Sequence, residues 1–246
     1  MSKEKLRPTL PAVCLQIFLL AFGLLSMRWF LFEPFTVPSG SMFPNLLVND
    51  YILVNKMSTG LKIPYINYWI LGPYLPKRGQ IVVFRSVKSD AYFVKRLMGL
   101  PGDIVKIKQH QIIDINGQRV TTTPAPDLWQ KLKKDFPYED SQDVTAYFED
   151  YKFFDNTHPK QFITMYKPIA DLAEVETYTV PPGQLLFLGD HRSSSSDGRV
   201  WGYVDVKDLV GPISKILFSC QTKQVSTQFC DLRTIRWDRV FSSPNS

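Results

Sequence analysis

The stretch DIVKIKQHQIIDINGQRV, residues 103–120, shows most clearly which kind of fold this chain adopts. Apolar and polar residues alternate along most of it, and a period of two is typical of a β-strand with one buried face. The pair Asn116-Gly117 interrupts the pattern, and this dipeptide is the preferred two-residue turn of a β-hairpin. We therefore expect a β-hairpin that turns at these two residues.

Four further runs predict strands, because each is rich in β-branched or aromatic residues and is bounded by turn-forming residues. They are DYILVNK (50–56), QIVVFR (80–85), YFVKRLMG (92–99) and QLLFLGD (184–190). The segment 121–178 has a different texture, and we interpret it as an irregular insertion that returns to the core at Val180. The predicted fold is mainly β: an antiparallel β-sheet core with an inserted second subdomain.

The composition of the 246 residues narrows the functional classes. With 44% hydrophobic and 21% charged residues, the chain is not expected to be intrinsically disordered. The net charge of +6 is spread without a long basic run, so we expect no nucleic-acid partner. None of the three cysteines belongs to a CxxC pair, and the sequence contains no metal-binding cluster and no nucleotide motif, so we expect no metal and no cofactor. A bridge between Cys220 and Cys230 is left open, because sequence cannot show how closely two cysteines approach.

The segment PAVCLQIFLLAFGLLSM, residues 11–27, carries no charge. A helix continuing to Phe32 would be about 33 Å long, enough for a hydrocarbon core of about 30 Å. We therefore expect a transmembrane anchor over 11–32, with residues 1–10 in the cytoplasm because they contain Lys3, Lys5 and Arg7. The alternatives are a signal peptide cleaved near Gly23 and a buried core helix.

Three short motifs carry the candidate chemistry: PSGSMFP (38–44), FVKRLMGLPGD (93–103) and GDHRSSSSDGRVWG (189–202). Taken singly, they are compatible with a turn, a solvated strand and a polar loop. In the second motif, however, Lys95 alternates with apolar residues and should point toward their side of the strand. Burial there would depress the pKa of this lysine.

Together, in this order and after an apolar segment, the motifs resemble those of the bacterial type I signal peptidases, which are endopeptidases with a serine/lysine dyad. The resemblance covers about 35–107 and 180–215. It implies that Ser41 is the nucleophile and that Lys95 is its general base.

The resemblance also implies supporting roles in the same motifs. Ser39 corresponds to the serine of the oxyanion hole, and Ser195 to the serine that orients the lysine. Structural support of the site is expected from Asp190, from Asp197 and Arg199, which correspond to an ion pair near the site, and from Gly189, which corresponds to the glycine that approaches the lysine. Departures from the residues usual in the family occur at His191, Ser193, Gly198 and Phe93.

The implied substrates are signal peptides of exported preproteins, cut after small-x-small sites. Only 13 residues separate position 27 from Ser41, so the nucleophile should lie near the membrane surface. The resemblance places the substrate pockets at apolar residues, namely Phe35, Val37, Pro38, Met42, Leu46, Phe93 and Val94. Ordinary core packing is the alternative for this set, above all for Phe35 and Leu46.

Elementary chemistry sets conditions on the dyad. Serine is a poor nucleophile until a neighbouring base takes its proton. A lysine with a pKa of about 10.4 is neutral only about once in 2,500 molecules at pH 7, whereas a pKa of about 7–8 makes it a usable base. That shift requires burial, and it requires that Asp197 pair with Arg199 rather than with Lys95.

Two other functions compete with this one. The first is a membrane-anchored hydrolase with a triad of Ser41, His191 and either Asp190 or Asp197, although Phe43 breaks a Gly-x-Ser-x-Gly elbow. The second is a non-catalytic extracytoplasmic binding domain.

We predict a monomeric, single-pass serine endopeptidase of the bacterial inner membrane, in contact with membrane lipid and with its catalytic domain on the periplasmic side. Its catalytic β core comprises 33–107 and 183–246, and its non-catalytic inserted subdomain comprises 108–182.

Overall fold

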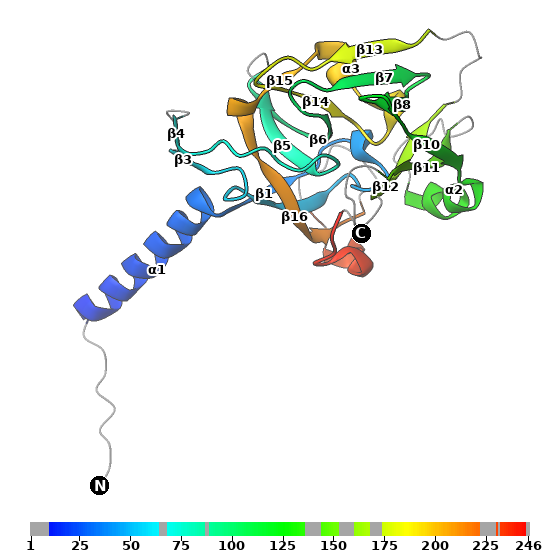
Figure 1. Cartoon of the computed structure of the whole chain (residues 1–246). Coiled ribbons are helices and arrows are strands. Elements are labelled where there is room, and N and C mark those ends of the chain that lie inside the picture. The colour runs from blue at the N-terminus through cyan, green and yellow to red at the C-terminus, as the bar shows by residue number, and fades with distance from the viewer. Residues whose placement is uncertain are drawn as a thin grey trace.

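The computed structural model describes residues 10–63, 68–86, 89–135, 144–152, 160–167, 174–221, 230 and 232–244. The expected cytoplasmic segment lies outside these residues except for Leu10, and so do parts of the expected insertion. Figure 1 shows a body made of β-sheets, from which one helix projects. The mainly β class predicted from the sequence is confirmed.

The largest sheet has seven strands in the order β1-β2-β16-β5-β6-β14-β15, and each pairs antiparallel with its neighbours. Their bounds are β1 (Phe32–Thr36), β2 (Asp50–Asn55), β16 (Leu209–Ser219), β5 (Ile81–Ser86), β6 (Ala91–Gly99), β14 (Gln184–Leu188) and β15 (Val204–Asp205). Four of them, β2, β5, β6 and β14, are the four predicted runs, and their ends agree with the prediction to within two residues.

A second sheet contains the hairpin that residues 103–120 predict. Its order is β13-β7-β8-β9, with bounds β13 (Glu176–Thr179), β7 (Ile104–Lys108), β8 (Gln111–Ile115) and β9 (Gln118–Arg119). Ile115 pairs with Gln118, and both turn residues have the positive φ of a type I′ turn, 55° at Asn116 and 80° at Gly117. The predicted turn is confirmed.

The turn between β7 and β8 has no such signal in the sequence. Gln109 and His110 occupy it with φ values of 51° and 69°, although neither is a glycine or an asparagine. This turn places the main chain and the ring of His110 against two arginines of the third motif.

The prediction that 121–178 is irregular was wrong. It contains a three-stranded sheet in the order β10-β11-β12, with bounds β10 (Thr121–Pro124), β11 (Thr145–Tyr151) and β12 (Lys160–Tyr166). A short helix, α2 (Pro126–Leu132), begins with the proline that suits a first helical position. The alternation of β11 is hidden because aromatic residues lie on both of its faces and because a buried polar residue, Glu149, replaces an apolar one.

The apolar core joins these sheets. One cluster packs the chain around Met42 against β2, β5 and β16. Another packs β6, β7, β8 and β14 against Tyr151 and Phe162 of the three-stranded sheet, so the inserted strands share a core with the large sheet. Further elements are a two-stranded hairpin, β3 (Leu61–Ile63) and β4 (Tyr68–Leu71), and a one-turn helix, α3 (Gly198–Trp201).

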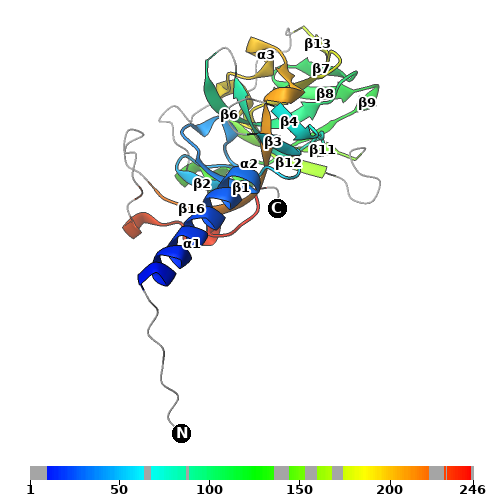
Figure 2. The same cartoon turned by 90° about the vertical axis from the view of Figure 1, so that its left-hand side faces the viewer.

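Helix α1 (Leu10–Phe30) projects from the body in both views (Figures 1 and 2). Its apolar side chains are exposed, for example Ile17 at 62%, Phe18 at 63% and Leu20 at 65%. This exposure excludes the core-helix alternative for the residues whose side chains are described. No helix in the described part of the chain combines the length and the apolarity that a membrane span requires.

The open question about the cysteines is answered. Cys220 and Cys230 form a disulfide, with their Cα atoms 5.6 Å apart, and Cys14 is a free thiol on α1.

Candidate active site

Ser41 and Lys95 meet inside the protein although 54 positions separate them. Ser41 lies in a single 3₁₀ turn, η1 (Gly40–Met42), and Lys95 lies in the middle of β6. The Lys95 Nζ atom is 2.6 Å from Ser41 Oγ, and the two residues are only 4% and 7% exposed. An amine at this distance is within reach of the proton of the hydroxyl.

The electrostatics of Lys95 agree with the condition derived from the sequence. Burial lowers its pKa from 10.5 to about 8, because water no longer stabilises the ammonium form. The carboxylates of Asp197 and Asp190 act in the opposite direction, and the guanidinium of Arg199 adds to the lowering.

Asp197 is engaged by Arg199, as expected. The guanidinium donates from Nε and from Nη2 to the two carboxylate oxygens, at 2.8 and 2.7 Å. The Gly189 N–H donates to Asp197 Oδ2 at 2.8 Å. Burial alone would raise the pKa of Asp197, but Arg199, the Gly189 amide and Ser195 lower it below its ordinary value.

Gly189 lies where no side chain fits. A Cβ atom built on it would be 2.1 Å from Ser195 Oγ and 2.7 Å from the carbonyl oxygen of Ser41. The structure therefore brings these three predicted residues together. The three atoms nearest to a Cβ on Gly189 belong to Ser195 and Ser41, and the expected approach of Gly189 to Lys95 stays a prediction. Among the hydrogen bonds of the described residues, none joins Ser195 to Lys95, so the lysine-orienting role of Ser195 stays a prediction.

Ser39 lies at the start of the turn that carries Ser41. Its backbone is extended and its side chain is exposed. The hydroxyl lies 3.4 Å from Ser41 Oγ, a long hydrogen bond within the pair. The predicted oxyanion-hole serine is thus adjacent to the serine it would assist.

Asp190 supports a different part of the site. Arg96 donates to both of its oxygens at 2.7 Å, and Asn45 Nδ2 donates to Oδ2, also at 2.7 Å. The ion pair is buried, with side chains 1% and 0% exposed. It holds the third motif to β6 and to the segment that follows Ser41.

The triad alternative finds little support in this geometry. Both of its candidate carboxylates are occupied by arginines. His191 donates its main-chain N–H to the Ser41 carbonyl at 3.0 Å. Burial lowers the pKa of its ring to about 4, with the main chain of Gly40 opposing and Lys167 adding to the effect.

The seven apolar residues assigned to substrate pockets fall into three groups. Five pack in one cluster beside Ser41: Phe35, Val37, Met42, Leu46 and Val94. Phe93 packs elsewhere, stacked on Phe84 in a separate cluster, and Pro38 is exposed. Met42 and Leu46 are fully buried, which is also what ordinary core packing produces.

Sequence reasoning missed several polar and charged residues around the site: Asn45, Arg96, His110, Glu149 and Arg192. Arg96 carried a signal, since it follows Lys95 in a strand that is otherwise apolar. Glu149 carried none, because a single carboxylate among aromatic residues does not indicate its partner. No group of three His, Cys, Asp or Glu residues in the described segments is placed to hold a metal ion.

A buried amine in contact with a serine hydroxyl, on an antiparallel β scaffold, is the arrangement of a Ser/Lys hydrolase. The family model described as "Signal peptidase, peptidase S26" matches residues 10–218. The chain is 33% identical to signal peptidase I of Buchnera aphidicola subsp. Schizaphis graminum, over 80% of this chain and 72% of that protein. It is 32% identical to signal peptidase I of Pseudomonas aeruginosa, over 87% of this chain and 71% of that protein.

A crystal structure of a signal peptidase I from Enterococcus faecalis aligns with 57% of this chain and 98% of its own, at 24% identity. Its TM-score of 0.34 is too low to support an inference. The family model and the two sequence relatives are sufficient to assign the chain to a family. The chain belongs to the signal peptidase family, peptidase S26, and is an enzyme of that family.

Proposed function

We propose that this enzyme removes signal peptides from exported preproteins, with Ser41 as the nucleophile and Lys95 as the general base. One observation carries the proposal: a buried lysine amine lies 2.6 Å from a serine hydroxyl. At a pKa of about 8, about one molecule in ten has a neutral Lys95 at pH 7, against about one in 3,000 at a pKa of 10.5. The neutral amine is therefore abundant enough to act as a base.

The reaction follows from these positions. Ser41 Oγ attacks the carbonyl carbon of the scissile bond while its proton passes to Lys95 Nζ. The tetrahedral intermediate collapses to a Ser41 ester as Lys95 gives that proton to the leaving amine. Water then attacks the ester while its proton passes to Lys95. As the C–O bond to Ser41 breaks, Lys95 returns that proton to Ser41 Oγ, which releases the new carboxyl terminus and restores the free enzyme.

Three further residues have proposed roles in this cycle. Ser39, 3.4 Å from the nucleophile, would donate a hydrogen bond to the oxyanion, and Ser195 would orient the side chain of Lys95. Asp197 is held by Arg199, which keeps its charge from pairing directly with Lys95. The pockets for small side chains that small-x-small sites require are proposed to lie at the apolar cluster beside Ser41.

Cleavage of a preprotein with an A-x-A site tests the proposal, using the full chain in detergent. The wild type should release the signal peptide, and Ser41→Ala should not, because the attacking oxygen is gone. Ser194→Ala is the matched control, since Ser194 is an exposed serine of the third motif. His191→Ala should keep turnover. Cleavage by Ser41→Ala, or its loss in His191→Ala with the fold intact, would contradict the proposed dyad.

The proposed location is the bacterial inner membrane, with the N-terminus in the cytoplasm and the body on the periplasmic side. Its support is helix α1, whose apolar side chains are exposed, together with Lys3, Lys5 and Arg7 before it. Protease treatment of sealed inverted vesicles tests this topology. The body should be protected until detergent is added; digestion without detergent would contradict it.

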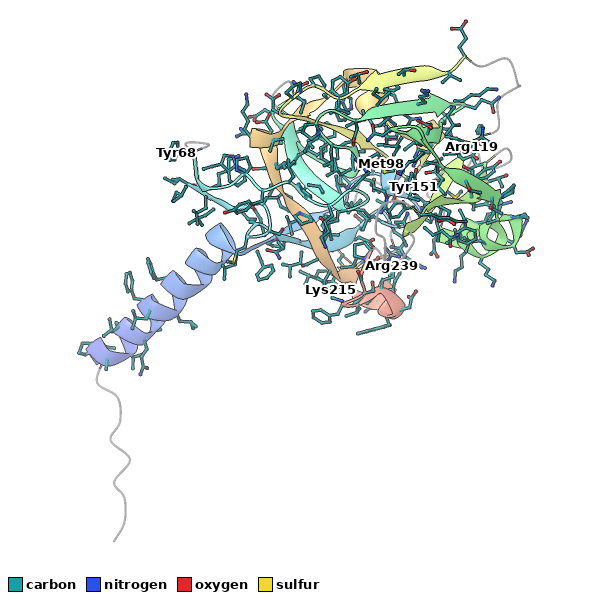
Figure 3. The ribbon with its side chains drawn as sticks, in the orientation of Figure 1. Tyr68, Met98, Arg119, Tyr151, Lys215 and Arg239 are labelled. Atoms are coloured by element: carbon teal, nitrogen blue, oxygen red, sulfur yellow. A yellow bond between two sulfur atoms is a disulfide. The ribbon has the colours of Figure 1, made fainter. Side chains whose placement is uncertain are left out.

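Membrane lipid is a proposed partner of the body as well. The β3–β4 hairpin exposes Tyr68, Ile70 and Leu71 at 62, 52 and 56%, near the point where α1 leaves the body (Figures 1 and 2). Figure 3 labels Tyr68 at the tip of this hairpin. Clusters of exposed apolar side chains mark contact surfaces. We propose that the enzyme acts as a monomer, which sedimentation in detergent would test.

A further inference from the structure

A buried ion pair joins the inserted three-stranded sheet to the third motif. Glu149 of β11 accepts two hydrogen bonds from Arg192, Nη1 to Oε1 at 2.7 Å and Nη2 to Oε2 at 2.6 Å. The two side chains are 0% and 1% exposed. Tyr151 donates its hydroxyl to Glu149 Oε2 at 2.5 Å, and Figure 3 labels this tyrosine in the interior, close to Met98. Buried charges are retained in proteins when they are paired in this way.

The arginine of this pair has a second set of contacts, to the main chain of its own loop. Arg192 Nε donates to the Gly189 carbonyl at 3.1 Å. The Arg192 carbonyl accepts a hydrogen bond from Arg199 Nη2 at 2.6 Å, and Arg199 is the residue that holds Asp197. Asp197 in turn accepts the N–H of Gly189. Both polar groups of Gly189 are thus held by side chains of the loop.

Gly189 is the point at which this network reaches the dyad. Its Cα faces Ser195 Oγ and the Ser41 carbonyl so closely that even a methyl group has no room. The next residue but one, His191, binds the Ser41 carbonyl through its N–H at 3.0 Å. A displacement of Gly189 would therefore move the surroundings of both serines.

The neighbouring inserted strand, β12, holds the same loop at other points. The Met165 N–H donates to the Asp190 carbonyl at 2.8 Å, and the Lys167 N–H donates to Ser193 Oγ at 3.3 Å. Asn45 bridges the two sides, because it donates to the Ile163 carbonyl at 2.8 Å as well as to Asp190. The inserted sheet and the residue that follows it therefore contact the third motif at Asp190, Arg192 and Ser193.

We propose that Glu149 is a positioning residue for peptide-bond cleavage: through Arg192 and Gly189 it fixes the third motif against Ser41 and Lys95. The inserted subdomain then belongs to the catalytic machinery, although it supplies no reacting atom. This inference rests on the proposed function of the dyad. A residue with a purely structural role would instead change the fraction of enzyme that is folded, without changing the rate or the pH dependence of the folded enzyme.

The test compares Glu149→Gln with the wild type in the full chain. The substrate is a peptide with an A-x-A site, and kcat and KM are measured from pH 6 to pH 10. We expect kcat to fall by about 10²-fold with little change in KM, because a shift of about 1 Å at reacting groups has an effect of that size. We also expect the rising limb of the profile to move to higher pH, because a loosened loop admits water to Lys95 and favours its ammonium form.

The direction in which the rising limb moves distinguishes a positioning role of Glu149 from a long-range effect of its charge on Lys95. Loss of a negative charge, with nothing else changed, would favour the neutral amine and move the limb to lower pH. Glu149→Asp, which keeps the charge, should recover part of kcat. Asp150→Asn is the matched control, since it removes the same charge one residue along the same strand, and it should behave as the wild type.

Each outcome of these measurements either supports or overturns the inference. Wild-type kcat and an unmoved limb in folded Glu149→Gln would overturn the inference, as would a limb moved to lower pH. If that variant does not fold, Tyr151→Phe, which leaves both charges in place, should lower kcat to a smaller extent and move the limb in the same direction; wild-type behaviour would then overturn the inference. A wild-type enzyme that does not cleave the peptide would instead contradict the proposed function.

Discussion

Replacing Lys95 with methionine should abolish turnover and change the pH dependence of folding stability. The structure buries this amine almost completely, with 4% of the residue exposed, and burial lowers its pKa to about 8. Methionine has a similar length and no charge. The comparison therefore isolates what it costs the folded protein to hold the lysine charge.

The magnitude follows from the two pKa values. Between 10.5 in the unfolded chain and about 8 in the folded one, the difference corresponds to about 3 kcal/mol, at about 1.36 kcal/mol per pH unit. The unfolded chain binds more protons than the folded chain between pH 8 and 10.5, so this contribution makes the wild type more stable as the pH rises. Below pH 8 the destabilisation is fully present. Above 10.5 it is absent.

Urea unfolding of both proteins from pH 7 to pH 10 measures the effect. The free energy of unfolding of the wild type, minus that of Lys95→Met, should increase by about 2.5 kcal/mol over this range. Taking the difference between the two proteins removes the contribution of other titrating groups. The control is Lys215→Met, at an exposed lysine of β16 labelled in Figure 3, which gives the effect of the same substitution at the surface. A difference independent of pH, or one that decreases as the pH rises, would refute the reasoning.

Five other substitutions give four further predictions for the peptide cleavage assay. Lys95→Arg should be as inactive as Lys95→Met, because a guanidinium cannot lose its proton in this pH range; measurable turnover would end the dyad proposal. Ser39→Ala should keep slow turnover, with kcat lower by about 10²–10³-fold, the usual effect of removing one oxyanion donor; an unchanged kcat would remove Ser39 from the site. Ser195→Ala should impair kcat more than Ser196→Ala, and the reverse order would shift the assignment of the third motif by one residue. Gly189→Ala should lower kcat by at least about 10²-fold, since its methyl group would collide with Ser195 and a backbone oxygen; full activity would show that the loop can move.

The sequence alone determined features that depend on local pattern. Alternation in 103–120, and the Asn116-Gly117 turn, predicted a hairpin that the structure contains, because strand period and turn conformation are properties of neighbouring residues. The lysine among apolar residues of β6 predicted a buried amine for the same reason. The resemblance of the three motifs to those of the family then identified Ser41 as the serine that contacts this lysine.

Tertiary structure decided what depends on residues far apart in the chain. Glu149 meets Arg192 across 43 positions, and Arg96 meets Asp190 across 94, and no local pattern encodes either pairing. The sheet in the insertion was missed because β11 is aromatic on both faces and buries a carboxylate whose partner is distant in sequence. A buried charge is tolerated only where the fold supplies its counter-charge, so its position becomes intelligible only when the partner is seen.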